Sequence, residues 1–590
     1  MSSAPLRARA RPALRRHQRG VALIIVTLII VLGVSWLLVS ALSTWLNPAA
    51  ANPTFNGRVL GEAKAALLGY VANEVMDDLT SNPERNPGRL PCPEYYSCQS
   101  SSGSCTPPPS PADGVAAAAC PPPAVGRLPW RTLGIDEPFD ASGTPLWYVV
   151  SPDWALPSTT ATLTINFNTS GQLTFNGQSN AAVGLIIAPG SPLAVPASTT
   201  GNCPARTQNR GSSPPDYRDY FECPNAAWPI GVDGFAASGA VGAFNDQVVQ
   251  VTPADVMRAI EGPIAQRIQT QIVPAINSVY TAANGWYDKN GNLLSQPLYP
   301  FAAPFNSPNP AVNPPNPGVV NNYEGVLPIK PDAASSVAWV TASVSASVIV
   351  GPNPKNIDCS NSTSNSVQCT FDLRKSSSPQ TLQVTASASK VGIGFRQPPG
   401  LLANVSYAGL TLSSASIQNT LVSDGTAQVV YQAVAPAAGG KVTVSIGINA
   451  ADDSITDANN SATGWFIRNQ WYMFTYYAVS GRYAPGGNEK CAGGPASTPC
   501  LTMYVDGVPN NNVRALLVFA GRFLTGVNTP LRPMTGDPAI GDPKSYFEGY
   551  NLRAATNYLS ATPPSSFWWV FDKHSAATSA FNDRTFSIAP

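Results

Sequence analysis

Residues 20–46 read GVALIIVTLIIVLGVSWLLVSALSTWL. This stretch contains no charged residue, and it is long enough for one helix to cross roughly 30 Å of hydrocarbon. A hydrophobic run of this length and purity is typical of a membrane helix rather than of a core helix. The sequence therefore predicts a single transmembrane helix over residues 21–46, preceded by a leader over residues 1–20.

The leader is strongly basic. It contains no acidic residue, and its six arginines are Arg7, Arg9, Arg11, Arg15, Arg16 and Arg19. Because the basic flank of a membrane helix remains in the cytoplasm, the amino end is predicted to be cytoplasmic. Everything after Asn47 is then expected on the far side of the membrane.

The apolar run is too long for an ordinary secretory signal, whose apolar region has about 7–15 residues. A plain signal anchor is one remaining interpretation. The other rests on Arg19-Gly20-Val21, which is followed by an unbroken apolar helix. This pattern resembles the leader of type IV pilin-like proteins, in which a prepilin peptidase cuts after a glycine on the cytoplasmic side. The resemblance implies cleavage between Gly20 and Val21.

The chain departs from the family pattern at the fifth mature position, where the usual glutamate is replaced by Ile25. In the resembled filaments that carboxylate neutralises the amino terminus of a neighbouring subunit inside the membrane, where an unpaired charge is costly. The large K-type minor pseudopilins of type II secretion share this absence. The resemblance implies a minor subunit at a filament tip or at initiation, with prepilin peptidase and other pseudopilins as partners in the bacterial inner membrane.

The composition is that of a turn-rich protein exported from the cytoplasm. Charged residues make up only 12% of the 590 residues, whereas Pro and Gly number 58 and 47. Without the six leader arginines, 29 basic residues face 34 acidic ones, a net charge of about −5 for the exported part. This balance argues against nucleic acid as a partner.

Ten cysteines, all beyond the membrane segment, suit the oxidising periplasm. Sequence proximity predicts three local disulfides, namely Cys203 with Cys223, Cys359 with Cys369, and Cys491 with Cys500. The remaining cluster of Cys92, Cys98, Cys105 and Cys120 allows three pairings, and the sequence does not choose among them. A zinc site is the competing interpretation, but the cluster lacks a nearby histidine and paired C-x₂-C spacing.

Residues 55–79 have apolar positions at helical spacing and predict a helix after the membrane segment. Asn47-Pro48 and Asn52-Pro53 are expected to bend or interrupt the connection, because proline lacks a backbone donor and clashes with the preceding turn.

The order of motifs indicates an internal duplication. The first copy reads 146–151, 173–177, 182–188, 220–222 and 244–247; the second reads 474–480, 501–507, 513–520, 546–548 and 581–584. A helix that Thr252 can cap and Pro253 can open precedes the second copy, with Val256 and Ile260 beginning its apolar side. Two helix-plus-sheet units are therefore predicted, over residues 55–251 and over 252–333 with 463–590.

The second copy is interrupted by about 130 extra residues. Within residues 334–462, apolar and polar residues alternate in short runs that turn residues separate, as in 345–350, 381–386, 428–433 and 441–448. Such alternation predicts an inserted β-sandwich.

No enzymatic constellation is visible. His574 is the only histidine beyond the leader, and no Gly-x-Ser-x-Gly element accompanies it. A pair of glycosidase acids could be far apart in sequence, but nothing points to one. Phe244-Asn245-Asp246 and Phe581-Asn582-Asp583 recur in both copies, which favours a shared structural turn over catalysis.

Two acidic loops have oxygens that calcium prefers. The better one contains Asp452, Asp453 and Asp457, and the other spans 288–292, where Asn290-Gly291 equally suits a hairpin turn. Neither has the complete twelve-residue loop that ends in glutamate.

Together these observations predict an α+β protein: a long amino-terminal transmembrane helix, two related pilin-like units of a helix on an antiparallel sheet, and an inserted all-β sandwich. The expected function is that of a non-enzymatic minor pseudopilin or pilin-like subunit of a type II secretion or type IV pilus-like filament, with its body in the periplasm. The alternatives are a signal-anchored periplasmic adhesin or binding protein and, third, an anchored carbohydrate-active enzyme.

Overall fold

The computed structural model describes a large part of the chain. The described residues are 48–76, 87–94, 113–118, 120, 124–156, 164–195, 203, 205–211, 215–227, 230–238, 243–281, 286–287, 299, 302, 323–327, 341–350, 355–358, 366–375, 377, 380–389, 400–408, 411–412, 418–421, 427–435, 437–449, 462–483, 500–528, 543–558 and 570–589. The predicted leader and transmembrane helix lie outside these ranges. Among the helices that are described, none has the length and apolar character needed to cross a membrane.

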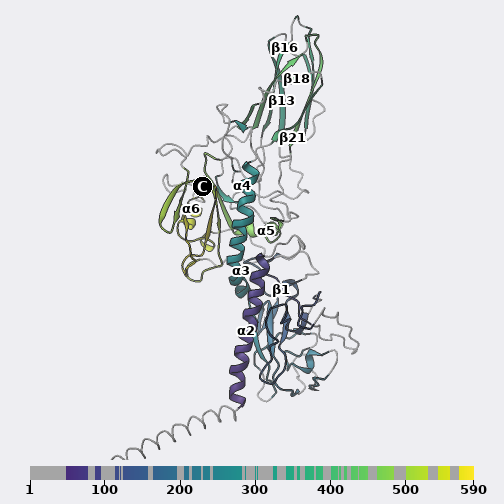
Figure 1. The fold of residues 1–590 in the computed structure, drawn as a ribbon, viewed down its shortest axis with the longest axis vertical. Helices are drawn as coiled ribbons and strands as arrows, with labels where there is room; N and C mark the ends of the chain where they lie inside the picture. The colour runs from purple at the N-terminus through teal and green to yellow at the C-terminus, as the bar shows by residue number, and fades with distance from the viewer. Residues whose placement is uncertain are drawn as a thin grey trace, which may run out of the picture.

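The fold is α+β and elongated, with helices along its length and mostly antiparallel sheets beside them (Figure 1). Helix α2 (Pro48–Met76) and a first four-stranded sheet lie at one end. Helices α3 (Pro253–Arg267) and α4 (Val273–Thr281) continue along the molecule beside a second four-stranded sheet. Two further sheets form the opposite end, beyond α4.

Helix α2 is continuous across Pro53, so the expected interruption at Asn52-Pro53 is absent. Proline has no amide hydrogen, so α2 lacks one backbone hydrogen bond at Pro53 and yet continues through it. Further along, one side of the helix is buried at helical spacing, through Val59, Leu60, Ala63, Leu67, Val71 and Val75.

The first sheet has the order β10-β7-β3-β2, formed by β2 (Ala124–Arg127), β3 (Trp147–Val150), β7 (Gly184–Ala188) and β10 (Gln247–Val251). All its pairs are antiparallel. Tyr148 and Ile186 belong to the core that also contains the buried side of α2. Trp147 and Ile187 belong to a second core formed with Tyr217 and Phe221. The sheet is thus covered on both faces.

The second sheet has the same order, β27-β25-β22-β12, formed by β12 (Glu324–Val326), β22 (Thr475–Val479), β25 (Ala515–Phe519) and β27 (Arg584–Ala589). The register corresponds as well. Gly126 lies opposite Tyr148 in the first sheet, and Gly325 lies opposite Tyr477 in the second. Tyr148 and Tyr477 in turn lie opposite Ile186 and Leu517.

Each sheet is accompanied by a hairpin, β5 (Leu173–Phe175) with β6 (Gln178–Ala182), and β23 (Leu501–Val505) with β24 (Val508–Val513). The turns are Asn176-Gly177 and Asp506-Gly507, and all four residues have positive φ angles of 48–86°. Asn-Gly and Asp-Gly are the sequences that such two-residue turns favour. Strand β26 (Val570–Lys573) adds a parallel partner to β23.

The second helix starts as its sequence predicts. Thr252 caps α3 in a capping box, in which its hydroxyl accepts the amide of Asp255 and the Asp255 carboxylate accepts the amide of Thr252. The helix then passes through a π-helical segment, η4 (Ile268–Ile272), before α4. We call the described residues from 48 to 251 the first unit, and those of 252–327 and 462–589 the second unit.

The described residues also form several shorter elements. They are β1 (Leu90–Pro91), η2 (Pro152–Trp154), β4 (Ala155–Leu156), β8 (Ala194–Val195), β9 (Arg206–Thr207), η3 (Tyr217–Asp219), β11 (Trp286–Tyr287), α5 (Gly464–Arg468), η6 (Trp471–Phe474), η7 (Pro543–Ser545) and α6 (Gly549–Tyr558).

The inserted region forms two sheets. One has the order β11-β19-β20-β16-β13, with β18 also paired to β20, and the other has the order β14-β15-β21-β17. The strands are β13 (Thr341–Val350), β14 (Lys355–Asp358), β15 (Ser366–Leu373), β16 (Gln380–Ser389), β17 (Gly400–Ala408), β18 (Thr411–Leu412), β19 (Gln418–Leu421), β20 (Ala427–Ala435) and β21 (Gly440–Asn449). All four runs of predicted alternation lie in these strands. Two sheets built in this way fit the predicted β-sandwich.

Candidate assembly region at the junction of the two units

The helices of the two units lie side by side and run parallel. Lys64 of α2 forms an ion pair with Asp255 in the first turn of α3, with an Nζ to Oδ2 distance of 2.8 Å. Further along, a guanidinium nitrogen of Arg267 donates to the carbonyl of Val75 at 3.1 Å. These contacts are 11 residues apart on α2 and 12 on α3, so the two helices advance in the same direction.

The Lys64 contact joins three elements. Its ammonium also donates to the carbonyl of Gln250 in β10 at 3.0 Å. Partial burial by itself would raise the pKa of Asp255, but hydrogen bonds from Lys64 and Thr252 outweigh it and lower that pKa. The carboxylate is therefore held in its charged form.

Arg267 is buried, with 2% of its surface exposed. Its Nε donates to Oε1 of Gln271 at 2.9 Å, and its guanidinium lies 4.4 Å from the ring centroid of Trp465. The indole Nε1 of Trp465 donates to the same Gln271 oxygen at 2.8 Å. The carbonyl of Val75 near the end of α2 thus accepts a hydrogen bond from Arg267, whose guanidinium is held by Gln271 and Trp465.

A loop of the first unit enters the second. The amide of Ile165 donates to Oδ1 of Asn469 at 3.2 Å, and Nδ2 of Asn166 donates to the Asn469 carbonyl at 3.0 Å. Asn469 is fully buried. Because buried amide groups require partners, these bonds fix the position of one unit on the other.

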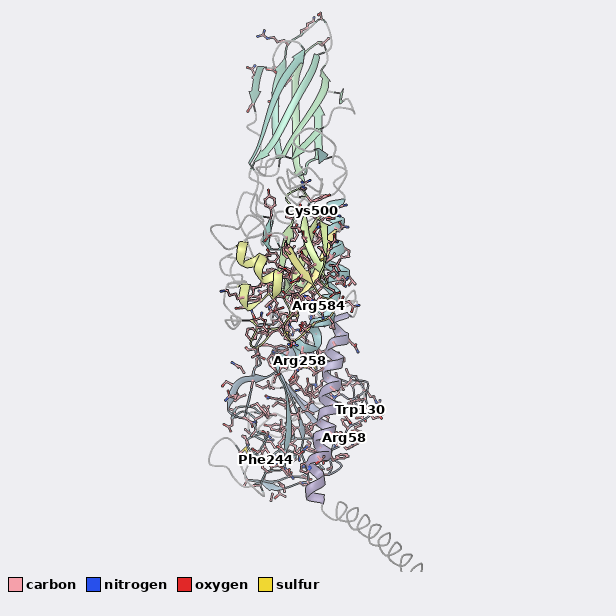
Figure 2. The ribbon with its side chains drawn as sticks, turned by 90° about the vertical axis from the view of Figure 1, so that its left-hand side faces the viewer. Arg58, Trp130, Phe244, Arg258, Cys500 and Arg584 are labelled. Carbon is pink, nitrogen blue, oxygen red and sulfur yellow. A yellow bond between two sulfur atoms is a disulfide. The ribbon has the colours of Figure 1, made fainter. Side chains whose placement is uncertain are left out.

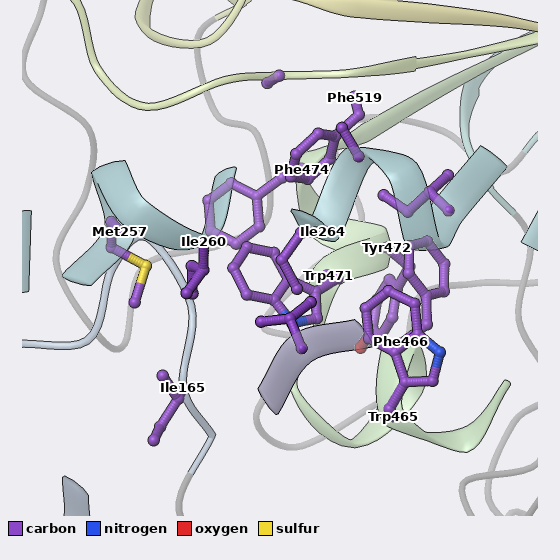
Figure 3. Packing of buried hydrophobic residues seen from close by; sticks show 14 of the residues in the cluster. Ile165, Met257, Ile260, Ile264, Trp465, Phe466, Trp471, Tyr472, Phe474 and Phe519 are labelled. Carbon is purple, nitrogen blue, oxygen red and sulfur yellow. The ribbon is translucent and has the colours of Figure 1, made fainter. Parts of the chain in front are cut away.

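Aromatic side chains complete the junction. Phe167 of the first unit makes edge contacts with Trp471 and Phe474 of the second, with ring centroids 5.3 Å apart in both pairs. Figure 3 shows Trp471 and Phe474 close to Ile260 and Ile264 of α3, with Ile165 on the neighbouring loop. One hydrophobic core includes residues of both units.

A buried polar network of the first unit includes the two residues that immediately precede β10, Asn245 and Asp246. Oε2 of Glu222 accepts the amides of Asn245 and Asp246, both at 3.0 Å. In return, Oδ2 of Asp246 accepts the amide of Glu222 at 3.1 Å and Nδ2 of Asn225 at 2.9 Å. Burial raises the pKa of both carboxyl groups, and each influences the other.

The second unit repeats this network. Oε2 of Glu548 accepts the amides of Asn582 and Asp583 at 3.1 and 3.3 Å. Oδ2 of Asp583 accepts the amide of Glu548 at 3.0 Å and Nδ2 of Asn551 at 3.1 Å. The recurring Asn-Asp dipeptides are therefore structural, as their recurrence suggested.

In the second sheet a buried carboxyl group takes the place of an apolar side chain. By register, the place of Val125 in the first sheet is taken by Glu324 in the second. Glu324 has 2% of its surface exposed, and its carboxylate accepts the hydroxyl of Tyr476. Burial raises the pKa of Glu324 to about 8, despite the opposing effect of that hydrogen bond.

One face of α2 is uncovered. Gly57, Gly61, Ala65 and Gly69 recur every four residues and are exposed, and around each of the three glycines a side chain would meet open space. Glycine disfavours a helix by about 1 kcal/mol relative to alanine, so this face offers little stabilisation to the isolated helix.

The predicted cysteine pairs are partly described. Cys203 is bonded to Cys223, as their proximity suggested, and Cys92 is bonded to Cys120, which selects one of the three possible pairings in that cluster. Cys500 is disulfide-bonded, whereas Cys491 lies outside the described residues. Cys369 lies in β15; Cys98, Cys105 and Cys359 are outside the description.

Of the remaining predicted sites, some lie outside the described residues and others lie within them. Gly20, Val21, Asp452, Asp453, Asp457 and the 288–292 loop lie outside the described residues. His574 packs on Phe581, with ring centroids 4.2 Å apart. Within the described ranges, no three or more His, Cys, Asp or Glu side chains are grouped in a way that could hold a metal ion. Sequence reasoning missed Arg267, Asn469 and Glu324, none of which belongs to a motif.

No protein-family model matches the chain, and neither a curated protein nor a solved structure does so.

Proposed function

We propose that the chain is a non-enzymatic, minor pseudopilin-like or pilin-like subunit of a type II secretion or type IV pilus-like filament, located at its tip or at initiation. It would be held in the bacterial inner membrane by residues 21–46, with its body in the periplasm. The observation that supports this most directly is the parallel packing of α2 on α3, each helix leading into a sheet of the same strand order. Such an arrangement suits stacking along a helical axis.

The internal duplication supports the same proposal. Strand order, register, hairpin turns and the buried Glu-Asn-Asp network correspond between the two units. We infer that each unit is one pilin-like module and that the second was duplicated without a membrane segment. The chain would then be two filament subunits in one polypeptide, with the sandwich inserted in the second.

The uncovered face of α2 fits an assembly role. Small residues at every fourth position allow another helix to approach the backbone closely. The amino end of α2 at Pro48 directly follows the predicted membrane span, so this face would meet other subunits near the membrane surface.

The amino terminus of the protein purified from its native envelope tests the proposal. Mass spectrometry should find a mature chain that begins at Val21, and a Gly20→Leu variant should keep the leader. The matched control is Gly33→Leu, which lies within the predicted span and should be processed normally. A native protein that retains residues 1–20 would contradict the filament role and favour the signal-anchored periplasmic adhesin or binding protein.

A further inference from the structure

A cationic cleft lies on the second unit, between α3 and the strands β26 and β27. It has a volume of about 260 Å³. Lys573 and Arg584 are its cationic lining residues, with His574 beside them, and none of the described residues that line it is acidic. The opposite wall is formed by Gly262, Gln266 and Gln269 on the helix.

The side chains of Lys573 and Arg584 are available to a ligand. Among the residues that the structure describes, the side chains of Lys573 and Arg584 make no ion pair or hydrogen bond. Lys573 and His574 interact electrostatically with Asp506, whose carboxylate accepts the amide and hydroxyl of Ser575. The two side chains thus bring positive charge to the cleft without an ion pair among the described residues, on a body whose predicted net charge is negative.

These cations are not required by the repeated fold. Arg584 lies opposite Phe519 at the start of β27, and the residue at the same register in the first sheet is Gln247, opposite Ala188. The segment of the first unit that pairs beside its hairpin, 230–238, contains no Lys, Arg or His. Because the first unit forms the same sheet without them, folding alone does not explain them.

The helical wall of the cleft is unusual. The π-helical segment Ile268–Ile272 includes Gln269, and such segments occur often at functional sites. Arg258 is exposed on α3 one turn before Gly262 and extends the positive charge along the same helix face. In Figure 2, Arg258 lies nearer to the first unit than Arg584.

We infer that this cleft binds an oxyanion of side-chain size, a carboxylate or a phosphate, through Lys573, Arg584 and the amides of Gln266 and Gln269. Guanidinium and ammonium groups supply charge-assisted hydrogen bonds to such oxygens, and amide nitrogens add neutral donors. The volume is below the usual range for a complete small-molecule site, about 300–1,000 Å³, and suits a single anionic group that another molecule presents. This inference does not depend on the filament role.

Isothermal titration calorimetry of the full chain in detergent, at low ionic strength, tests it with succinate and with inorganic phosphate as probes. Tighter binding of succinate would identify a carboxylate source, and tighter binding of phosphate a phosphate source. The double variant Lys573→Gln, Arg584→Gln should weaken binding of the preferred anion at least about tenfold, roughly 1.4 kcal/mol. The variant Lys441→Gln, at an exposed lysine in β21, should change it less than about twofold.

Two results would overturn the inference: no detectable heat with either anion at 10 mM or so, or equal affinity in the wild type and the double variant. If the double variant does not fold, Arg584→Gln alone decides the question, because glutamine is the residue that the first sheet has at this register. That single variant should still weaken binding about threefold or more.

Discussion

A buried guanidinium nitrogen of Arg267 lies 3.1 Å from the carbonyl oxygen of Val75, so a side chain of α3 satisfies the last turn of α2. This contact joins the end of the first helix to a residue of the second unit that lies 192 positions later in the chain. Because the same guanidinium packs on Trp465, the side chain of Arg267 brings α2, α3 and α5 into contact.

Replacing Arg267 should be costly. The Arg267→Ala variant removes the side-chain donor to the Val75 carbonyl, removes one of the two donors to Oε1 of Gln271, and removes the contact with Trp465. We expect the free energy of unfolding to fall by about 2–4 kcal/mol, measured by denaturant titration. The control is Arg58→Ala, whose exposed ion pair with Glu62 should contribute less than about 0.5 kcal/mol. Equal losses in both variants would show that Arg267 does not cap α2.

The Phe167→Ala variant should uncouple the two units. The ring contacts Trp471, Phe474 and Phe519, and its loss removes these three aromatic contacts with the second unit. We expect a loss of about 3 kcal/mol and a calorimetric transition that separates into two. Phe139→Ala, at a ring with 42% of its surface exposed, should leave one transition. A single sharp transition in the Phe167 variant would argue against a cooperative junction.

Glu548→Gln should destabilise the second unit. The glutamate accepts the amides of Asn582 and Asp583 with one oxygen and Nδ2 of Asn528 with the other, at 2.9 Å. A glutamine can accept at only one of these positions and places a donor against a donor at the other. A loss of about 2–3 kcal/mol is expected in a denaturant titration. The same substitution at the exposed Glu62 serves as the reference and should be neutral; a neutral Glu548 variant would refute the structural role of the network.

Glu324 should make stability depend on pH. Its pKa in the folded protein is about 8, above its ordinary value of 4.5, so the folded state retains a proton that the unfolded state releases. The stabilisation from this group is complete below pH 4.5 and is lost as the pH rises through 8. Glu94, whose pKa burial raises to about 7, acts in the same direction.

The informative measurement is the difference between variants. Denaturant midpoints at pH 5, 7 and 9 should fall less steeply for Glu324→Gln than for the wild type, because glutamine does not ionise and still accepts the Tyr476 hydroxyl. Glu62→Gln should follow the wild type. Parallel pH profiles for the wild type and the Glu324 variant would mean that folding does not raise the pKa of this carboxyl group.

Sequence patterns predicted the local structure well where backbone chemistry is distinctive. Thr252 and Pro253 identified the start of α3, and alternation identified the strands of the insert. The π-helical segment was missed, although a signal exists. Val256, Ile260, Ile264, Ile268, Ile272 and Ile276 recur every four residues and are all buried. In a 3.6-residue helix that spacing drifts by about 40° per step, and one wider turn restores the face.

The junction could not be predicted, because its contacts join residues that are distant in sequence and belong to no pattern. Asn166 and Asn469 are 303 residues apart, and nothing local distinguishes them from surface asparagines. The cationic cleft was missed for the same reason, since Gly262 and Lys573 meet only after the second unit has folded.

The parallel arrangement of α2 and α3 has a mechanical consequence. A pull along the long axis, applied between the Pro48 end of α2 and the sandwich, would load Lys64–Asp255 and Arg267–Val75 together in shear rather than breaking them one after the other. The two units should therefore resist tension together and separate abruptly rather than gradually.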